Sequence, residues 1–282
     1  MISPIDEEKI NRLKRIANEI RKDVITMVYR AGSGHVGGSL SAVEIVTALY
    51  FHKMVHDPSN PFWKERDKFI LSKGHAAPLL YAVLARCGYF PKEELFTLRM
   101  LNSRLQGHPS MGSPPGVEVS SGSLGQGLSI AAGIALAAKL DKLRSRIYVL
   151  LGDGEMQEGQ VWEAANAIAH HKIDNLCAII DKNRYQLDGK VEDIMSIDPL
   201  EEKFRSFRWN VFMIDGHNFK EIIHSLDEAE KVRGIPTVII ANTIKGKGAK
   251  VFENNNKFHG TPPTEEEYIQ AMKELEEEQW EN

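Results

Sequence analysis

Five short apolar runs constrain the fold of this chain more than any other feature. They read KFILS, RIYVLL, NLCAII, WNVFMI and PTVIIA, and begin at residues 68, 146, 175, 209 and 236. Each run is continuously apolar rather than alternating, which is typical of strands buried on both faces of a parallel sheet. Stretches with helical character separate them at 75–87, 158–171 and 218–232. The sequence therefore predicts an α/β fold, a doubly wound and mostly parallel sheet with helices on both faces.

A long first helix is expected before the sheet. Ser3-Pro4 has the form of an N-cap followed by proline, and apolar residues then recur at helical spacing as far as Ala31-Gly32. The segment AGSGHVGGSL, residues 31–40, is too rich in glycine for a helix, so we expect a loop there. After it, Ser41-x-x-Glu44 has the pattern of a capping box that opens a second helix.

Length and charge narrow the classes of function. The 282 residues suffice for one large domain, which we place at 1–263, followed by an acidic helix or tail at 264–282. The net charge of −4 argues against nucleic-acid binding, because a phosphate backbone requires a clustered basic surface. We find no signal peptide or membrane span, and Cys87 and Cys177 form no metal or disulfide motif. A cytoplasmic protein with two core thiols is expected.

Polar residues follow two of the predicted strands. Asp153, between Gly152 and Gly154, ends one run, and Asn183 ends the next. A single helix between them makes a βαβ unit, whose right-handed crossover places both strand ends at one edge of the sheet. A carboxylate, an amide oxygen and a backbone carbonyl beyond Asn183 suit Mg²⁺ and leave positions for diphosphate and water. The glycines would let the backbone approach a phosphate, although Asp-Gly on its own is most often a simple turn.

The whole run from LLGDGEMQEG to IIDKN resembles the thiamine-diphosphate motif that opens with GDG and closes with Asn. The chain as a whole resembles the N-terminal, diphosphate-binding module of transketolases. Ordered matches occur at AGSGHVGG, LSKGHAAPLLYAVLA, LQGHPS, SGSLGQGLSIAAGIALA, GDGEMQEGQVWEAA, DKNRYQLDG and IKGKGAKVFENNNKFHG. The resemblance implies that the cofactors are thiamine diphosphate and Mg²⁺.

The resemblance also implies a set of site residues. Asp153, Asn183 and the backbone carbonyl of Tyr185 would hold the metal. Residues close to the diphosphate would be Gly152, Gly154, His75, Asn183, Lys245 and His259. Backbone groups of Gly122 and Leu124 would meet the aminopyrimidine. Glu158 would join a carboxylate network across a subunit interface, or would be an acid stabilised by the dipole of a helix N-terminus. Lys245 and Lys247 could instead form a solvated basic turn.

Four of the ten histidines stand out, and each lies beside glycine in an expected loop or strand-to-helix turn. They are His35, His75, His108 and His259. The resemblance implies that His35 and His108 face the substrate and that His259 lies near the reacting carbon. Imidazoles titrate near neutrality and can carry the protons that ketol transfer moves. The other six, His52, His56, His170, His171, His217 and His224, are expected to be ordinary surface or core residues.

The implied activity is transfer of a two-carbon ketol unit between sugar phosphates through a thiamine diphosphate adduct, as in the pentose phosphate pathway. In transketolases, the glutamate that activates the cofactor lies on a second, pyrimidine-binding module, and we find no such module in this sequence. The chain is therefore expected to be the N-terminal subunit of a split transketolase, completed by a C-terminal subunit in a heterotetramer with two copies of each chain. A truncated chain would look the same. Alternatives are a deoxyxylulose-phosphate synthase, the α subunit of a 2-oxo-acid dehydrogenase, or a catalytically silent binding module.

Overall fold

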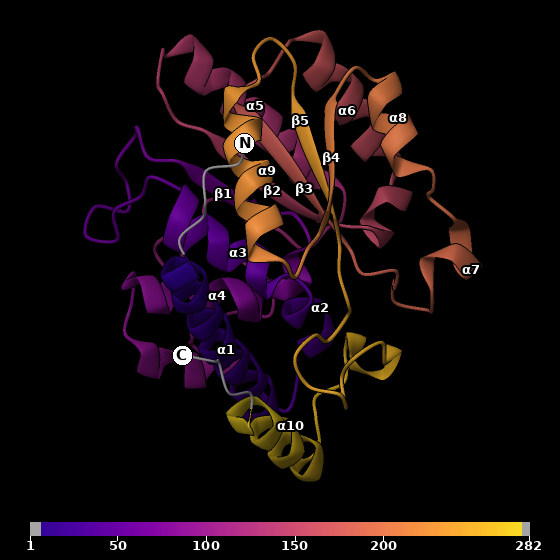
Figure 1. Cartoon of the computed structure of the whole chain (residues 1–282). Helices are drawn as coiled ribbons and strands as arrows, with labels where there is room; N and C mark the ends of the chain where they lie inside the picture. The colour runs from indigo at the N-terminus through magenta and orange to yellow at the C-terminus, as the bar shows by residue number, and fades with distance from the viewer. Residues whose placement is uncertain (1–6, 278–282) are drawn as a thin grey trace.

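The computed structural model of the chain describes residues 7–277. A parallel sheet with strand order β1-β2-β3-β5-β4 lies at its centre (Figure 1). The strands are β1 (Lys68–Leu71), β2 (Ile147–Gly152), β3 (Leu176–Lys182), β4 (Asn210–Asp215) and β5 (Thr237–Asn242). Each of the five apolar runs is a strand, so the predicted sheet is confirmed.

Helices cover both faces of this sheet (Figure 1). They are α1 (Glu7–Ala31), α2 (Val36–Leu40), α3 (Val43–Ala48), α4 (Ala77–Cys87), α5 (Gln126–Leu140), α6 (Gly159–His170), α7 (Val191–Met195), α8 (Leu200–Ser206), α9 (Phe219–Lys231) and α10 (Glu265–Glu277). Phe69 and Ile179 of the sheet belong to one core with α1, α3, α4 and α9, whereas Ile70 and Ile180 belong to another with α5, α6 and α8. The doubly wound architecture is therefore confirmed.

The βαβ unit β2-α6-β3 has the geometry that the sequence predicted. The two strands are parallel neighbours, and Gly152 lies opposite Asp181 in their register. Their carboxyl ends therefore lie side by side at the same edge of the sheet.

Two local predictions between α1 and α3 are wrong. The glycine-rich segment contains the helical turn α2, and α3 begins after Ala42, which has no side-chain cap. The hydroxyl of Ser41 donates to Gly38 O and to Asp181, and Glu44 pairs with Arg21, so no capping box forms. Tertiary partners compete successfully for both side chains because the buried charges of Asp181 and Arg21 require hydrogen-bonding partners.

The acidic C-terminal segment forms α10, which packs against α1. The rings of Tyr29 and Tyr268 stack at 4.3 Å, and Asn18 Nδ2 donates to Leu275 O at 2.9 Å. The division of the chain at residue 263 stays a prediction, and the expected start of the first helix at Ser3-Pro4 lies outside the described residues. None of the helices in the described part combines the length and apolar character needed to cross a membrane.

Candidate functional site

The carboxyl ends of the central strands open on a pocket of about 230 Å³. Nine of the residues expected at the site line it: His75, Leu124, Gly152, Asp153, Gly154, Glu158, Asn183, Tyr185 and His259. The other four are His35, His108, Gly122 and Lys245, each in contact with another member of the group. The structure thus brings all the sequence-predicted site residues together.

Asp153 and Asn183 bring a carboxylate and a side-chain amide to this pocket. Asp153 is 1% exposed, and its carboxylate accepts hydrogen bonds from Gly154 N at 2.9 Å and Arg184 N at 2.5 Å. Asn183 Oδ1 accepts one from Tyr185 N at 3.1 Å. Burial, together with a neighbouring carboxylate, raises the pKa of Asp153 to about 7. Burial and the neighbouring charge thus disfavour the ionised form of Asp153, and a cation bound beside it would stabilise that form.

That neighbouring carboxylate is Asp181, which the sequence analysis did not assign to the site. It is fully buried and accepts hydrogen bonds from Ser41 Oγ at 2.5 Å, Lys73 Nζ at 2.5 Å, Asn183 Nδ2 at 3.3 Å and the hydroxyl of Thr243. Burial alone would raise the pKa of Asp181, but the Lys73 ammonium and the hydrogen bonds from Ser41 and Thr243 together outweigh burial and lower it. Because the amide nitrogen of Asn183 donates into this cluster, its oxygen is left for the pocket. A carboxylate at the end of an apolar strand was the signal available in the sequence.

His35, His75, His108 and His259 form one cluster. The ring centroid of His35 lies 5.3 Å from that of His75, 5.7 Å from that of His259 and 6.2 Å from that of His108. Burial, reinforced by nearby cations, lowers the pKa of His35 to about 4 and that of His259 to about 3. Both imidazoles are therefore neutral at pH 7, and their pKa values lie below the near-neutral range expected from the sequence.

Lys245 lies beside this cluster rather than in a solvated turn. It is 1% exposed, and its ammonium contacts Asn256 Oδ1 at 2.8 Å and His259 Nδ1 at 2.9 Å. Burial, and then the charge of Lys73, lower its pKa to about 7. Lys247 behaves as the alternative expected, since it pairs with Glu253 at 3.2 Å in a partly exposed position. An anion in the pocket would stabilise the charged form of Lys245.

The loop before α5, which carries Gly122 and Leu124, is held by two residues that the sequence analysis did not single out. The buried carboxylate of Glu155 accepts a hydrogen bond from Gly125 N at 2.8 Å, and Gln160 Nε2 donates to Leu124 O at 2.8 Å. Glu158 is the N-cap residue of α6 and also lines the pocket, so both roles considered for it stay open. The loop is therefore fixed relative to the end of β2.

The sequence of the chain matches a known protein family. A family model described as "Transketolase, thiamine diphosphate binding domain" matches residues 12–279. The chain belongs to this family. The resemblance drawn from the sequence motifs is therefore confirmed.

Two kinds of relative show this similarity. The chain is 46% identical to a 6-deoxy-6-sulfo-D-fructose transketolase subunit of Clostridium sp. (strain MSTE9), over 97% of this chain and 99% of the relative. It is 40% identical to an apulose-4-phosphate transketolase subunit of Phocaeicola vulgatus, over 95% of each. It is also 40% identical to human transketolase, but it covers only 43% of that longer protein. The crystal structure of Campylobacter jejuni transketolase matches with a TM-score of 0.89 and 36% identity, over 94% of this chain and 42% of that one.

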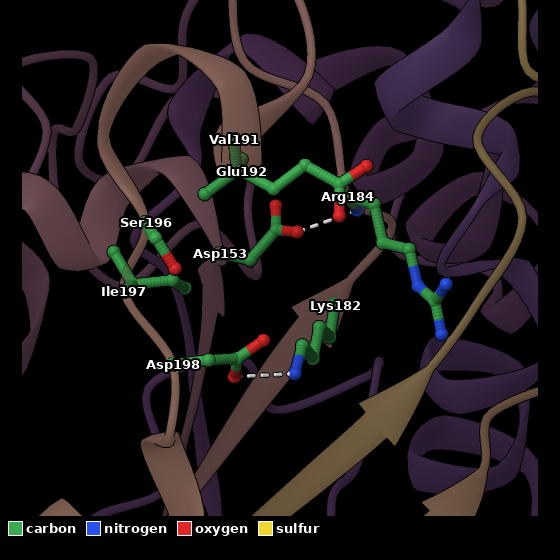
Figure 2. Close-up of a pocket in the computed structure, with 8 residues that line it drawn as sticks. All are labelled: Asp153, Lys182, Arg184, Val191, Glu192, Ser196, Ile197 and Asp198. Carbon is green, nitrogen blue, oxygen red and sulfur yellow. Dashed lines mark hydrogen bonds and ion pairs between the residues drawn. The ribbon is translucent and has the colours of Figure 1, made fainter.

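A second pocket, of about 180 Å³, lies beside Asp153, as Figure 2 shows. Its lining residues are Asp153, Lys182, Arg184, Val191, Glu192, Ser196, Ile197 and Asp198. Lys182 Nζ pairs with Asp198 Oδ1 at 2.6 Å within it. Most of the lining residues belong to the segment between β3 and α8. The apolar residues of this segment follow no regular spacing, so no sequence pattern indicated a pocket there. It holds none of the four clustered histidines of the transketolase module.

The residues of the first pocket fit a magnesium diphosphate. Across residues 7–277, no three His, Cys, Asp or Glu side chains meet as a metal-binding group, so a metal here would need oxygens from its ligand. Asp153 supplies one anionic oxygen and Lys245, beside the pocket, supplies positive charge, whereas the charge of Lys73 is already paired with Asp181. At Gly152, an added Cβ would meet only Lys73 Cβ, at 3.9 Å, which leaves room for a phosphate close to the backbone.

Proposed function

We propose that this chain is the N-terminal subunit of a split transketolase, which transfers a two-carbon ketol unit from a ketose to an aldose sugar phosphate together with a C-terminal subunit. The convergence of Asp153, Asn183 and the four histidines on one pocket carries this proposal. Similarity along nearly the whole length of separately encoded transketolase subunits supports it. A cytoplasmic location belongs to the same proposal and is supported by the free thiols of Cys87 and Cys177.

In this proposal the pocket binds Mg²⁺ and thiamine diphosphate. Asp153, Asn183 and the carbonyl of Tyr185 hold the metal, and Lys245 and His75 balance the diphosphate charge. When bound, thiamine diphosphate would supply a nucleophilic carbon for ketol transfer. Gly122 and Leu124 position the aminopyrimidine through their backbone groups, while the partner subunit excludes water from the open side.

The histidines handle the protons of the sugar. The neutral ring of His259 accepts from the Lys245 ammonium at Nδ1, so its Nε2–H donates to a substrate oxygen and stabilises the negative charge that develops there. His35 and His108 lie in contact with each other and hold the remaining hydroxyl groups of a polyol. This arrangement favours ketose phosphates over 2-oxo acids, which have no such row of hydroxyls.

The test is reconstitution. The chain, purified alone and with candidate partner chains, is assayed for ketol transfer from xylulose 5-phosphate to ribose 5-phosphate with Mg²⁺ and thiamine diphosphate. Donors named by the relatives, 6-deoxy-6-sulfofructose and apulose 4-phosphate, are assayed in parallel. We expect turnover only with a partner. Full turnover by the chain alone would contradict a split subunit.

A variant assigns the measured activity to this site. We expect His259→Ala to lower kcat/KM of the reconstituted enzyme by about 100-fold, the usual scale for one acid–base group, with a nearly unchanged melting temperature. Normal turnover in this variant would exclude His259 from the reaction.

A further inference from the structure

The loop Thr243–Gly248 follows β5 and carries Lys245. On each side of Lys245, a backbone group of the loop forms a hydrogen bond with a side chain outside the pocket. Ile244 N donates to His217 Nε2 at 2.8 Å, and Lys247 O accepts from Arg21 Nε at 3.1 Å. Neither His217 nor Arg21 lines the pocket. The two residues thus contact the loop without belonging to the lining of the pocket.

The two anchors are joined through Glu44 of α3. Its Oε1 forms a salt bridge with Arg21, and its Oε2 lies 3.1 Å from His217 Nδ1. The side chains of Arg21, Glu44 and His217 are only 4%, 9% and 13% exposed. Burial by itself would raise the pKa of Glu44, but the Arg21 guanidinium, with His217, outweighs burial and holds it at about 2. Glu44 is therefore an anion that accepts from both partners.

These contacts determine which nitrogen of His217 carries the proton. A backbone N–H can only donate, so Nε2 of His217 must accept the bond from Ile244. The proton is then on Nδ1, where it is donated to the Glu44 carboxylate. A carboxylate, an imidazole and a backbone amide thus form one directed chain of hydrogen bonds.

Close packing leaves these parts little freedom to shift. The turn that presents His217 contains Gly216, where an added Cβ would clash with Thr243 Cγ2. Gly248 has φ +109°, and an added Cβ there would lie 2.5 Å from the Arg21 side chain. His217 N also donates to Asp215 Oδ1 at 2.8 Å, which fixes the turn itself.

We propose that His217 is a positioning residue, which with Glu44 and Arg21 fixes the Thr243–Gly248 loop so that Lys245 presents its ammonium group to the diphosphate. The part that concerns the diphosphate rests on the proposed function. The part that concerns the loop does not. A histidine that the sequence analysis assigned to the surface or core thereby becomes part of cofactor recognition.

Two matched substitutions distinguish the hydrogen bond between His217 and Ile244 N from the hydrogen bond between His217 and Glu44. In His217→Gln, the amide oxygen reaches the position of Nε2 and can still accept from Ile244 N. In His217→Asn, the shorter side chain reaches only the position of Nδ1, so the bond to Glu44 is kept and the bond to Ile244 is lost. Both replacements are neutral and polar, and folding of each is checked by its melting curve.

The first measurement is hydrogen exchange at the Ile244 amide in the full chain without cofactor. We expect exchange about 10-fold faster in His217→Asn, the scale of one net hydrogen bond, and a rate within about twofold of wild type in His217→Gln. Equal rates in both variants would overturn the positioning role. Because this measurement uses no ligand, it does not depend on the proposed function.

The second measurement is calorimetric affinity for Mg²⁺ with inorganic pyrophosphate. We expect about 10-fold weaker binding in His217→Asn and near-wild-type binding in His217→Gln. Weaker binding in His217→Asn with unchanged exchange at Ile244 would overturn positioning through the loop. If Lys245→Met binds pyrophosphate as tightly as wild type, the proposed function fails at Lys245, and faster exchange in His217→Asn would still support the anchor.

Discussion

At the scale of single residues, Asp153 differs from its neighbours because it lies between two pockets and next to a second buried carboxylate. Asp181 pairs directly with Lys73, at 2.5 Å, whereas Asp153 accepts hydrogen bonds from the backbone N–H groups of Gly154 and Arg184. Such a carboxylate is poorly stabilised by the protein alone. A divalent cation is the partner that suits this position.

The first prediction removes that charge. Asp153→Asn should weaken the Mg²⁺-dependent affinity for thiamine diphosphate by at least about 100-fold, since even indirect changes at metal sites cost about 10–100-fold. Calorimetry measures this. Glu192→Gln, which changes the second pocket only, is the control and should bind normally. Equal affinities in the two variants would refute the metal assignment.

The second prediction concerns pH. The pKa of Asp153 is about 7 in the folded chain, against an ordinary value of 3.8, so the folded state without a cation holds a proton that the unfolded state has released. The contribution of this group to stability is therefore full at low pH and is lost as pH rises through about 7. Mg²⁺ competes with the proton, so its stabilising effect should appear above pH 7 and fade below it.

Melting curves of the chain with and without Mg²⁺, between pH 5 and 8, test this. Asp153→Asn should show no such pH-dependent gain from Mg²⁺. A magnesium effect that is constant across this range in the wild-type chain would contradict the prediction.

The residues that face a ligand were easier to predict from the sequence than the residues that support them. The positions of Asp153, Asn183 and the four clustered histidines were predicted because motifs carry them. Asp181 and Glu155 were not, because each acts through contacts with segments far away in the chain. His217 was assigned no role for the same reason, since a single histidine in a turn has no local pattern that indicates its partners.

At the scale of elements, the strands were predictable and the glycine-rich turn α2 was not. A buried parallel strand is recognised by a continuous apolar run, which depends little on its neighbours. Gly37 and Gly38 instead lie in a helical turn that packs against Lys245 and His75, where an added Cβ would lie 3.3 Å from Lys245 Cγ and 3.1 Å from His75 Nε2. At this turn, close tertiary contacts outweigh the low helix propensity of glycine.

The third prediction uses two glycines of α5. An added Cβ at Gly127 would clash with Ser72 Oγ, whereas at Gly133 it would meet nothing within 4 Å. Gly127→Ala should therefore destabilise the chain by about 1–3 kcal/mol through overpacking. Gly133→Ala, in the same helix, should stabilise it by about 0.5–1 kcal/mol through helix propensity. Denaturant unfolding measures the free energy of unfolding of both variants. If both substitutions change it in the same direction, Ser72 at the end of β1 can move to accommodate a larger residue in α5.

At the scale of the whole molecule, the pocket is open on the side where Leu187 is 65% exposed, and α5 exposes Leu140 at 74%. Both observations fit a chain that associates with others. The fourth prediction is that, with its partner subunit, the chain forms an assembly with two copies of each. Light scattering should give twice the summed mass of one copy of each chain, and a one-to-one complex at micromolar concentration would contradict it.

The buried cluster around Asp181 also has a consequence for biosynthesis. Its partners Ser41, Lys73 and Thr243 are 140, 108 and 62 residues away along the chain. Contacts this distant form only after long loops have closed, which is slow and costly in entropy. On a ribosome, the cluster cannot be complete until Thr243 has emerged. Thiamine diphosphate can therefore stabilise only chains whose synthesis has passed this residue, and it cannot guide the first steps of folding.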